Sequence, residues 1–309
     1  MCNDSNVILG ARGFIGSQIF LHKKRNNSKV RGYARSKDLN YEKGVIENLE
    51  VGVNSLHNIK INENDIIYDC IGLKTEYYGM NLTEFESHKS RIIEYYEKLC
   101  DHIDKNKARK LVFISSSGAL FNTNQSPGRI VTEESNPIIV DGYGASTQIV
   151  EQTLINSQLF SKGKIVIVRP TNLFGSNQTY KNNQGLIPRI FQALVNDEII
   201  SITNNKNEVR DYLYIEDFLE AIDQIVDEVG IYNISSQEMK SGFDVLESIG
   251  KVMAIHNSRA RVLLRKGDKS QYSPLLVSSE KLRLRTKWKP KWNFENAIQK
   301  TIEHYFECK

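Results

Sequence analysis

The sequence predicts an α/β fold in which a doubly wound parallel sheet is followed by a smaller C-terminal α/β part. Short apolar runs alternate with stretches of helical period up to Pro170, and a glycine-rich turn follows the first run. Strands that alternate with helices form parallel β-α-β units. After Pro170 the pattern changes to loops rich in Asn and Gly between shorter helices. This change predicts a second part that caps the first.

The apolar periodicity sets the expected order of elements. In the first part we expect the strands Val7–Leu9, Lys29–Ala34, Ile66–Ile71, Lys110–Ser115 and Lys164–Arg169, and the helices Gly13–His22, Thr83–Asn106 and Tyr143–Phe160. In the second part we expect the helices Gly185–Asn196, Glu216–Glu228, Gly242–Ala254 and Phe294–Phe306. Residues 1–172, with 209–236 returning to them, should form the first domain. Residues 173–208 and 237–309 should form the second.

Composition excludes several classes of protein. The chain has 309 residues and a net charge of +4, and its basic residues are scattered, which argues against nucleic-acid binding. The four cysteines form no C-x-x-C pair, so neither a zinc site nor a disulfide framework is expected. No signal peptide is evident, and no apolar run approaches the roughly 18 residues of a membrane span. We therefore expect a cytoplasmic protein that binds no metal and no membrane.

The glycine-rich turn predicts a dinucleotide site. Gly10-Ala-Arg-Gly13-Phe-Ile-Gly16 follows the first strand and opens the first helix. Glycines there permit a tight turn, close approach of the backbone to a pyrophosphate and close helix–strand packing. The turn therefore favours a Rossmann-type domain, against the alternative of a glycine-rich turn without a ligand. The expected cofactor contacts are Gly10, Arg12, Gly13, Phe14, Ile15 and Gly16.

The end of the second strand favours NADP over NAD. An NAD site usually places Asp or Glu there to hold the ribose 2′-hydroxyl. Here the position holds Ala34, followed by Arg35, and Arg12 lies in the glycine turn. Guanidinium groups suit a 2′-phosphate because they bind it bidentately. The alternative is that both arginines are solvated surface charges.

Further motifs give the chain a resemblance to the extended short-chain dehydrogenase/reductases, which epimerise, reduce or dehydrate nucleotide sugars. The motifs, in order, are Asp65-Ile-Ile-Tyr-Asp-Cys-Ile-Gly72, Phe113-Ile-Ser-Ser-Ser117, Thr132-Glu133, Tyr143-Gly-Ala-Ser, Arg169-Pro-Thr-Asn172-Leu-Phe-Gly175, Gly185-Leu-Ile-Pro188, Arg210-Asp-Tyr-Leu-Tyr-Ile-Glu-Asp217, Arg265-Lys-Gly-Asp268 and Trp288-Lys-Pro-Lys-Trp292. The resemblance implies that Tyr143 and Ser117 are catalytic and that Ile71, Gly72 and Tyr143 contact the cofactor. It also implies a homodimer.

The same resemblance points to a nucleotide-sugar substrate. Arg210 and Arg265 are guanidinium groups suited to a diphosphate. Asn172 offers an amide, and Leu186 offers an apolar wall for the base. A plain surface ion pair, or a turn cap in the case of Asn172, is the alternative for these polar residues.

One position departs from the family pattern. The family has a lysine four residues after its tyrosine, whereas Tyr143 is followed at that spacing by Thr147. A free tyrosine has a pKa of about 10, so without a cation it is a poor base but can still donate a proton. The alternatives are that Lys74 supplies the charge, or that Tyr77 or Tyr78 replaces Tyr143.

The departure favours reduction over oxidation. We expect NADPH-dependent reduction of a nucleotide-linked keto-sugar, with a 4-keto-6-deoxyhexose as the suggested sugar, in surface-polysaccharide sugar biosynthesis. A dehydratase is disfavoured because Ser117 is followed by Gly118 and Ala119 instead of an acid. The alternatives are a nucleotide-sugar 4-epimerase with tightly bound cofactor, and a protein that binds NADP and nucleotide sugar without catalysis.

Overall fold

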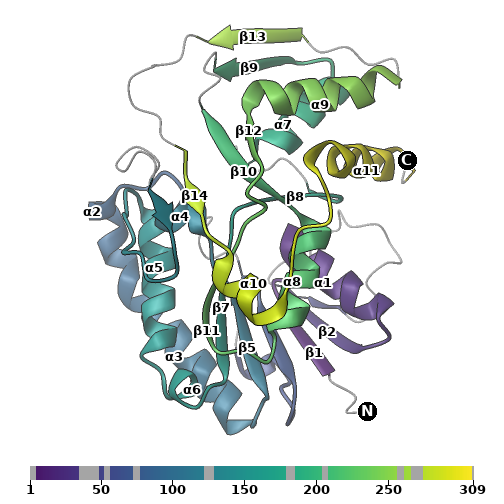
Figure 1. The fold of residues 1–309 in the computed structure, drawn as a ribbon. Helices are drawn as coiled ribbons and strands as arrows, with labels where there is room; N and C mark the ends of the chain where they lie inside the picture. Colours follow the sequence, from purple (N-terminus) through teal and green to yellow (C-terminus); the bar gives the residue numbers. More distant parts are fainter. Residues whose placement is uncertain are drawn as a thin grey trace. The chain divides into compact units, whose positions relative to one another are not determined.

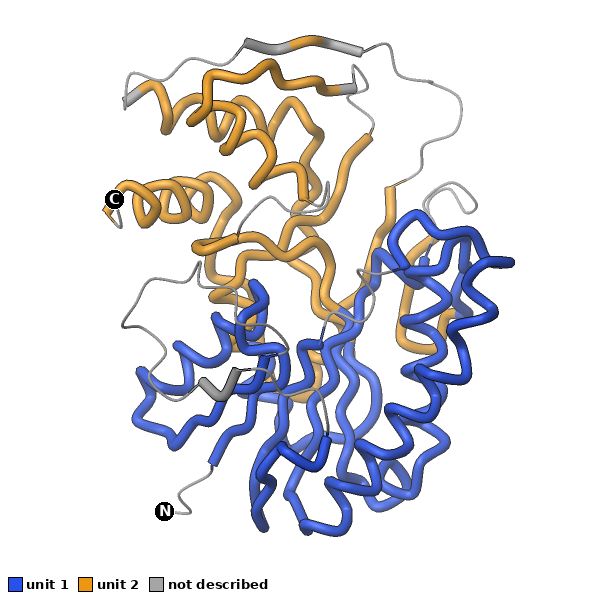
Figure 2. Tube along the Cα trace, turned by 180° about the vertical axis from the view of Figure 1, so that it is seen from behind, with its two compact units in different colours: residues 1–121, 136–169, 221–232 blue, residues 122–135, 170–220, 233–309 orange. Residues whose placement is uncertain are grey.

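The chain divides into two compact units (Figure 2). The computed structural model describes residues 5–34, 49–51, 56–71, 77–121, 129–178, 185–203, 208–255, 261–265 and 274–307. Unit 1 comprises residues 1–121, 136–169 and 221–232, and unit 2 comprises 122–135, 170–220 and 233–309. The segment that returns to the first unit is therefore 221–232, shorter than the expected 209–236. Residues 122–135 belong to the second unit.

Unit 1 is built on a seven-stranded sheet in the order β11-β7-β5-β4-β1-β2-β3. From β7 to β3 every neighbouring pair is parallel. The strands are β1 (Ser5–Leu9), β2 (Lys29–Ala34), β3 (Leu49–Val51), β4 (Ile66–Asp69), β5 (Lys110–Ile114), β7 (Ile165–Pro170) and β11 (Gly230–Ile234). The doubly wound parallel sheet is confirmed. The residues of β4, β5 and β7 are all buried, which explains their continuous apolar runs.

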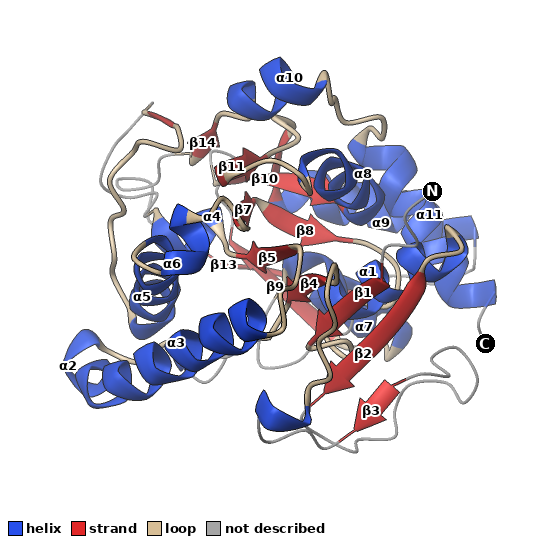
Figure 3. Ribbon diagram, turned by 90° about the horizontal axis from the view of Figure 1, so that it is seen from below, coloured by secondary structure: helices blue, strands red, loops and turns tan. Residues whose placement is uncertain are grey.

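Helices cover both faces of this sheet (Figure 3). α3 packs on α5 at one face, and α1 lies on the other. The helices and helical turns of unit 1 are α1 (Phe14–Arg25), η1 (Leu56–Asn58), α2 (Leu82–Phe85), η3 (Glu86–His88), α3 (Lys89–Lys105), α4 (Ser117–Leu120), α5 (Gly142–Ile155) and α6 (Gln158–Ser161).

The expected helix Tyr143–Phe160 is two helices. α5 ends at Ile155, and the hydroxyl of Ser157 accepts the backbone N–H of Phe160 and caps α6. A serine that bonds nearby backbone competes with helix continuation. The helical pattern alone did not reveal this break.

Unit 2 contains three small sheets, ordered β12-β10-β8, β13-β9 and β14-β6. None of these strands was expected from the apolar pattern. They are β6 (Ile130–Val131), β8 (Asn172–Phe174), β9 (Ile199–Thr203), β10 (Val209–Tyr214), β12 (Met239–Ser241), β13 (Arg261–Arg265) and β14 (Leu276–Val277). Except for β9, β10 and β13 they have two or three residues, too few to show an alternating pattern.

The helices of the C-terminal region match the expected positions closely. They are α7 (Leu186–Val195), α8 (Ile215–Ile225), α9 (Gly242–Ile255), α10 (Glu280–Thr286) and α11 (Phe294–Glu307), of which only α10 was not expected. α7 and α9 pack against β9 in unit 2 (Figure 1). Among the described residues, no helix is both long enough and apolar enough to cross a bilayer.

Two buried aspartates organise the backbone of unit 2. Asp211 Oδ1 accepts from Thr171 Oγ1 at 2.8 Å and from Ser236 N and Oγ, and its Oδ2 accepts from Gln237 N at 2.8 Å. Asp217 accepts the backbone N–H groups of Lys291 and Trp292. Burial raises the pKa of each carboxyl, against the effect of these hydrogen bonds. The aspartates therefore have structural roles.

Replacing Asp211 with alanine should destabilise unit 2. Asp211→Ala leaves several buried donors without their acceptor, which should lower the free energy of unfolding by about 3 kcal/mol. Urea unfolding followed by tryptophan fluorescence measures this loss of stability, because Trp288 and Trp292 both lie in unit 2. Glu220→Ala is the control: it removes an exposed pair with Lys291 and should cost less than about 1 kcal/mol. Equal effects of the two substitutions would contradict the role given to Asp211.

Candidate functional site

The glycine turn of unit 1 is shaped by two close approaches of backbone. Gly10 has a φ of +79°, and a Cβ on it would lie 2.6 Å from the carbonyl oxygen of Cys70. A Cβ on Gly16 would lie 2.3 Å from the carbonyl oxygen of Gly10. The N–H groups of Gly10 and Ala11 both donate to Tyr33 O, at 2.9 and 3.0 Å. The turn is thereby fixed against the carboxyl ends of β2 and β4.

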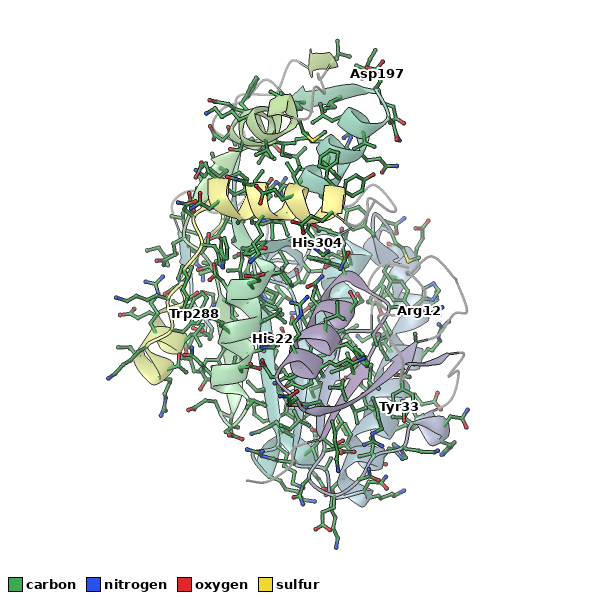
Figure 4. The ribbon with its side chains drawn as sticks, turned by 90° about the vertical axis from the view of Figure 1, so that its right-hand side faces the viewer. Arg12, His22, Tyr33, Asp197, Trp288 and His304 are labelled. Atoms are coloured by element: carbon green, nitrogen blue, oxygen red, sulfur yellow. The ribbon has the colours of Figure 1, made fainter. Side chains whose placement is uncertain are left out.

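The N-terminus of α1 suits a negatively charged group. Gly13 is its N-cap and provides no side-chain hydrogen bond, and the first turn contains no acidic residue. Such a helix end offers backbone N–H donors and a positive dipole to a phosphate. Arg12 lies at this end of α1 and His22 further along it (Figure 4). Phe14 and Ile15 are half-buried in the first turn. This cradle fits the pyrophosphate of a dinucleotide.

The remaining residues expected to contact the cofactor are described only in part. β2 ends at Ala34, with no carboxylate at its end, whereas Arg35 lies outside the described residues. Ile71 is half-buried after β4, and its N–H donates to Asp69 Oδ1 at 3.0 Å. Gly72 and Lys74 also lie outside the described residues.

The three consecutive serines after β5 have different partners. Ser115 is buried and its hydroxyl donates to the carboxylate of Glu151. Ser117 is fully buried, and its Oγ donates to the carbonyl oxygen of Arg169 at 2.9 Å. Ser116 is half-buried, and its hydroxyl is hydrogen-bonded to the phenol of Tyr143. The serine that meets the tyrosine is therefore Ser116, one residue before Ser117, for which the resemblance implies a catalytic role.

Tyr143 stands in the first turn of α5 among neutral and acidic groups. Asp141 caps this helix by accepting the Gly144 N–H at 2.8 Å. The ring of Tyr78 contacts that of Tyr143 edge-on, with 5.8 Å between centroids. Burial raises the pKa of the phenol, Tyr78 and Asp141 raise it further, and the hydrogen bond to Ser116 lowers it. The net effect is a raised pKa, so the phenol stays protonated at neutral pH.

Thr147 brings no positive charge to Tyr143. It is fully buried, and its hydroxyl donates to the Tyr143 carbonyl oxygen at 2.9 Å, one helical turn back. Within the described part of the chain, no cation contributes to the pKa shift of Tyr143. Of the two alternative tyrosines, Tyr77 lies in the core against Phe85 and His88, whereas Tyr78 is 55% exposed beside Tyr143.

The residues expected to bind substrate belong to unit 2. Asn172 is exposed at the start of β8, and its amide donates to Asp211 O at 2.9 Å on neighbouring β10. Arg210 on β10 is exposed and makes a long 3.5 Å contact with Glu208. β8 and β10 thus place these two residues on adjacent strands. Leu186 is the first residue of α7. Arg265 is the last residue of β13, and the Arg265 side chain lies outside the part of the chain that the structure describes.

Sequence reasoning missed Ser116, Glu151 and Arg169 as members of this site. Arg169 Nε lies 3.0 Å from Glu151 Oε1, and a terminal guanidinium nitrogen lies 2.6 Å from Oε2. The available signal was a single charged residue in each of two elements, Glu151 in α5 and Arg169 in the mostly apolar strand β7. Charged residues are rarely buried unless they are paired. The sequence could therefore suggest that Glu151 and Arg169 are paired, but it could not show with which residues.

The family model described as "NAD dependent epimerase/dehydratase family" matches residues 6–235. A dTDP-4-dehydro-6-deoxyglucose reductase of Escherichia coli is 24% identical over 219 residues, which cover 69% of this chain and 67% of the reductase. A dTDP-D-glucose 4,6-dehydratase of Dictyostelium discoideum is 26% identical over 271 residues, which cover 79% of this chain and 61% of that protein. The chain thus spans about two thirds or less of the length of these relatives.

The fold has close counterparts among solved structures. A UDP-glucose 4-epimerase of Thermotoga maritima, solved with UDP-glucose, superposes with a TM-score of 0.79 at 16% identity. The superposition covers 98% of this chain and 99% of the epimerase. At this identity the similarity establishes the shared fold.

A methyl group at position 16 should disrupt the phosphate cradle. Gly16→Ala places a Cβ against the Gly10 carbonyl, and overpacking of this kind costs about 1–3 kcal/mol. We expect the Kd for NADPH, measured by fluorescence titration, to rise about tenfold or more. Gly250→Ala on α9, where a Cβ meets nothing within 4 Å, is the control and should leave the Kd unchanged. Unaltered NADPH binding by Gly16→Ala would place the cofactor elsewhere.

Proposed function

Because the chain belongs to the NAD dependent epimerase/dehydratase family, we propose that it reduces the carbonyl of a nucleotide-linked keto-sugar with NADPH. A 4-keto-6-deoxyhexose is the proposed sugar class, and the similarity to a dTDP-4-dehydro-6-deoxyglucose reductase supports it. The observation that carries the proposal is the surrounding of Tyr143: among the described residues only neutral and acidic groups shift its pKa, and Thr147 stands in place of a lysine. We place the reaction in the cytoplasm and in sugar supply for surface polysaccharide.

Tyr143 is the general acid of the proposed reaction. Its pKa is raised, so the phenol holds its proton at neutral pH and can donate it to a carbonyl oxygen that gains negative charge. Alcohol oxidation would need the phenolate, which this site disfavours. An epimerase needs both steps in one cycle, so the same environment makes epimerisation the less favoured reaction.

Ser116 is the second group of the proposed site. Ser116 is half-buried, and its hydroxyl is hydrogen-bonded to Tyr143. The hydroxyl of Ser117, in contrast, donates its hydrogen bond to the carbonyl oxygen of Arg169. A hydroxyl fixed beside the acid can orient the phenol and bond the developing oxyanion. The catalytic role that the sequence suggested for Ser117 is therefore assigned to Ser116 in this proposal.

The cofactor, when bound, supplies the hydride that reduces the carbonyl. The chain's contribution is to hold it: Gly10, Gly13 and Gly16 shape the turn, and α1 faces the pyrophosphate. The absence of a carboxylate at the end of β2 and the presence of Arg12 support NADP over NAD. Asn172 and Arg210 are exposed on adjacent strands of unit 2 and would bind the substrate diphosphate.

The first test is direct turnover. Purified protein with nucleotide-linked 4-keto-6-deoxyhexoses should consume NADPH steadily, as followed by its absorbance, and Tyr143→Phe should reduce the rate about 100-fold or more. Thr147→Lys is the matched variant: a cation near the phenol should lower its pKa and raise the rate of the reverse alcohol oxidation.

The alternatives give different results. Epimerised product without net NADPH consumption would indicate a 4-epimerase. NADPH binding without any turnover would indicate a binding protein.

The second test is the pH dependence of the reduction. An acid whose pKa is raised keeps its proton until the pH passes that value, so the rate should not fall through loss of this proton below about pH 10. Ser116→Ala removes the hydrogen bond that lowers the pKa and should decrease kcat about tenfold, whereas Ser117→Ala should change it less. An alkaline fall in kcat centred near pH 7 that disappears in Tyr143→Phe would reveal a cation beside the phenol and contradict the proposed acid.

A further inference from the structure

We propose that the buried ion pair of Glu151 and Arg169 is a positioning device, which holds the serines on either side of Ser116 so that Ser116 faces Tyr143. The inference rests on the proposed function of Tyr143 as the acid. It assigns to the pair no contact with substrate or cofactor.

The ion pair is close and enclosed. The guanidinium of Arg169 spans both carboxylate oxygens of Glu151, with Nε at 3.0 and 3.2 Å and a terminal nitrogen at 2.6 Å. The two side chains are 5% and 4% exposed, and the ring of Phe121 lies 5.8 Å from the guanidinium carbon. A bidentate pair fixes orientation as well as distance. The ion pair joins α5 to the carboxyl end of β7.

Both partners of the pair reach the serine segment. The carboxylate of Glu151 accepts the hydroxyl of Ser115, and the backbone carbonyl of Arg169 accepts the hydroxyl of Ser117. Ser116 is extended, with φ −159° and ψ 122°. Ser115 is thereby anchored to α5 and Ser117 to the backbone of β7. With both neighbours held, the backbone of Ser116 is fixed where its hydroxyl meets Tyr143, which α5 also carries.

The same helix carries the acid and one member of the pair. Tyr143 and Glu151 lie on α5, about two turns apart. Fixing Glu151 to Arg169 and Ser115 fixes α5 against the ends of β5 and β7. A small slide of α5 would move the phenol away from Ser116, and misplacement of about 1 Å at a catalytic group can cost about 100-fold in rate.

Stability alone is a poor explanation for this pair. Desolvation offsets much of the attraction in a buried ion pair, and apolar residues of similar volume are often as stabilising. The carboxylate of Glu151 is also the acceptor for the Ser115 hydroxyl, and the residue that carries the guanidinium accepts the Ser117 hydroxyl through its backbone carbonyl. Among the described residues, the groups that act on the pKa of the phenol are Ser116, Tyr78 and Asp141. The pair therefore acts on Tyr143 through the serine segment and through the position of α5.

The test is a mutant cycle with a readout that needs no turnover. The Cζ NMR shift of Tyr143 at neutral pH, assigned with Tyr143→Phe, reports the hydrogen bond of the phenol in the full chain. Ser116→Ala should displace this shift and lower kcat about tenfold. The neutral double variant Glu151→Leu with Arg169→Met should displace the shift in the same direction and lower kcat about 10- to 100-fold. Adding Ser116→Ala to the double variant should change neither value further, because the hydrogen bond is already lost.

A second, partly buried ion pair in unit 1 is the control. Asp223 binds Lys23 at 2.6 Å and His22 at 2.7 Å, on α8 and α1. Lys23→Met with Asp223→Leu should alter thermal stability while the Tyr143 shift and kcat stay at wild-type values. If the variant with Glu151→Leu and Arg169→Met does not fold, Ser115→Ala takes its place in the test. Ser115→Ala removes one anchor of the serine segment, so it should displace the Tyr143 shift in the same direction as Ser116→Ala does.

Three results would overturn the proposal. One is a wild-type Tyr143 shift in the folded double variant, one is a wild-type shift in Ser115→Ala, and one is a triple variant whose effects are the sum of those of its parents. A wild-type protein that consumes no NADPH would refute the proposed reaction instead, and the NMR cycle would still decide the role of the pair.

Discussion

Parallel pairing is the constraint on which the candidate site depends. β2, β1, β4, β5 and β7 run in the same direction, so their carboxyl ends meet at one edge of the sheet. The glycine turn, the segment after Asp69 and the three serines each follow one of these ends. Ligands bind at this edge in open α/β sheets because loops and helix N-termini converge there. The location of the candidate site in unit 1 therefore follows from strand direction.

In the proposed reaction, the electrostatics of Tyr143 decide which half-reaction is favoured. A phenol that is partly buried and surrounded by Ser116, Tyr78 and Asp141 loses more from ionisation than a phenol in water does. Such a group can donate a proton but abstracts one poorly. Under the proposed function, Thr147 in the place where the family pattern has a lysine therefore affects the favoured direction of the reaction.

Buried charges serve two purposes in this chain. Asp211 and Asp217 satisfy backbone and hydroxyl donors that converge from separate segments of unit 2, so they fix loops. Glu151 and Arg169 satisfy each other and also two of three adjacent serines, so they select the orientation of the third. The first arrangement concerns stability, and the second concerns the geometry of a proposed site.

The sequence alone determined the alternation of strands and helices, the glycine turn, Tyr143 and the missing lysine at Thr147. These features are local: each is encoded by spacing within one element or one turn. The short strands of unit 2 were not predictable, because two or three residues carry no period and their pairing partners are distant in sequence. The predicted helix Tyr143–Phe160 is divided by a hydrogen bond to the hydroxyl of Ser157, and the pattern of apolar residues carries no information about that bond.

Only the tertiary structure decided which serine meets the tyrosine. Ser115, Ser116 and Ser117 are chemically identical, and the resemblance implied a catalytic role for Ser117 without saying which serine contacts Tyr143. Their roles differ because Glu151 and Arg169, 36 and 52 residues further along the chain from Ser115 and Ser117, accept the hydroxyls of these two outer serines. Partners at that separation come together only when α5 and β7 pack beside β5, so no pattern within the serine segment could reveal them.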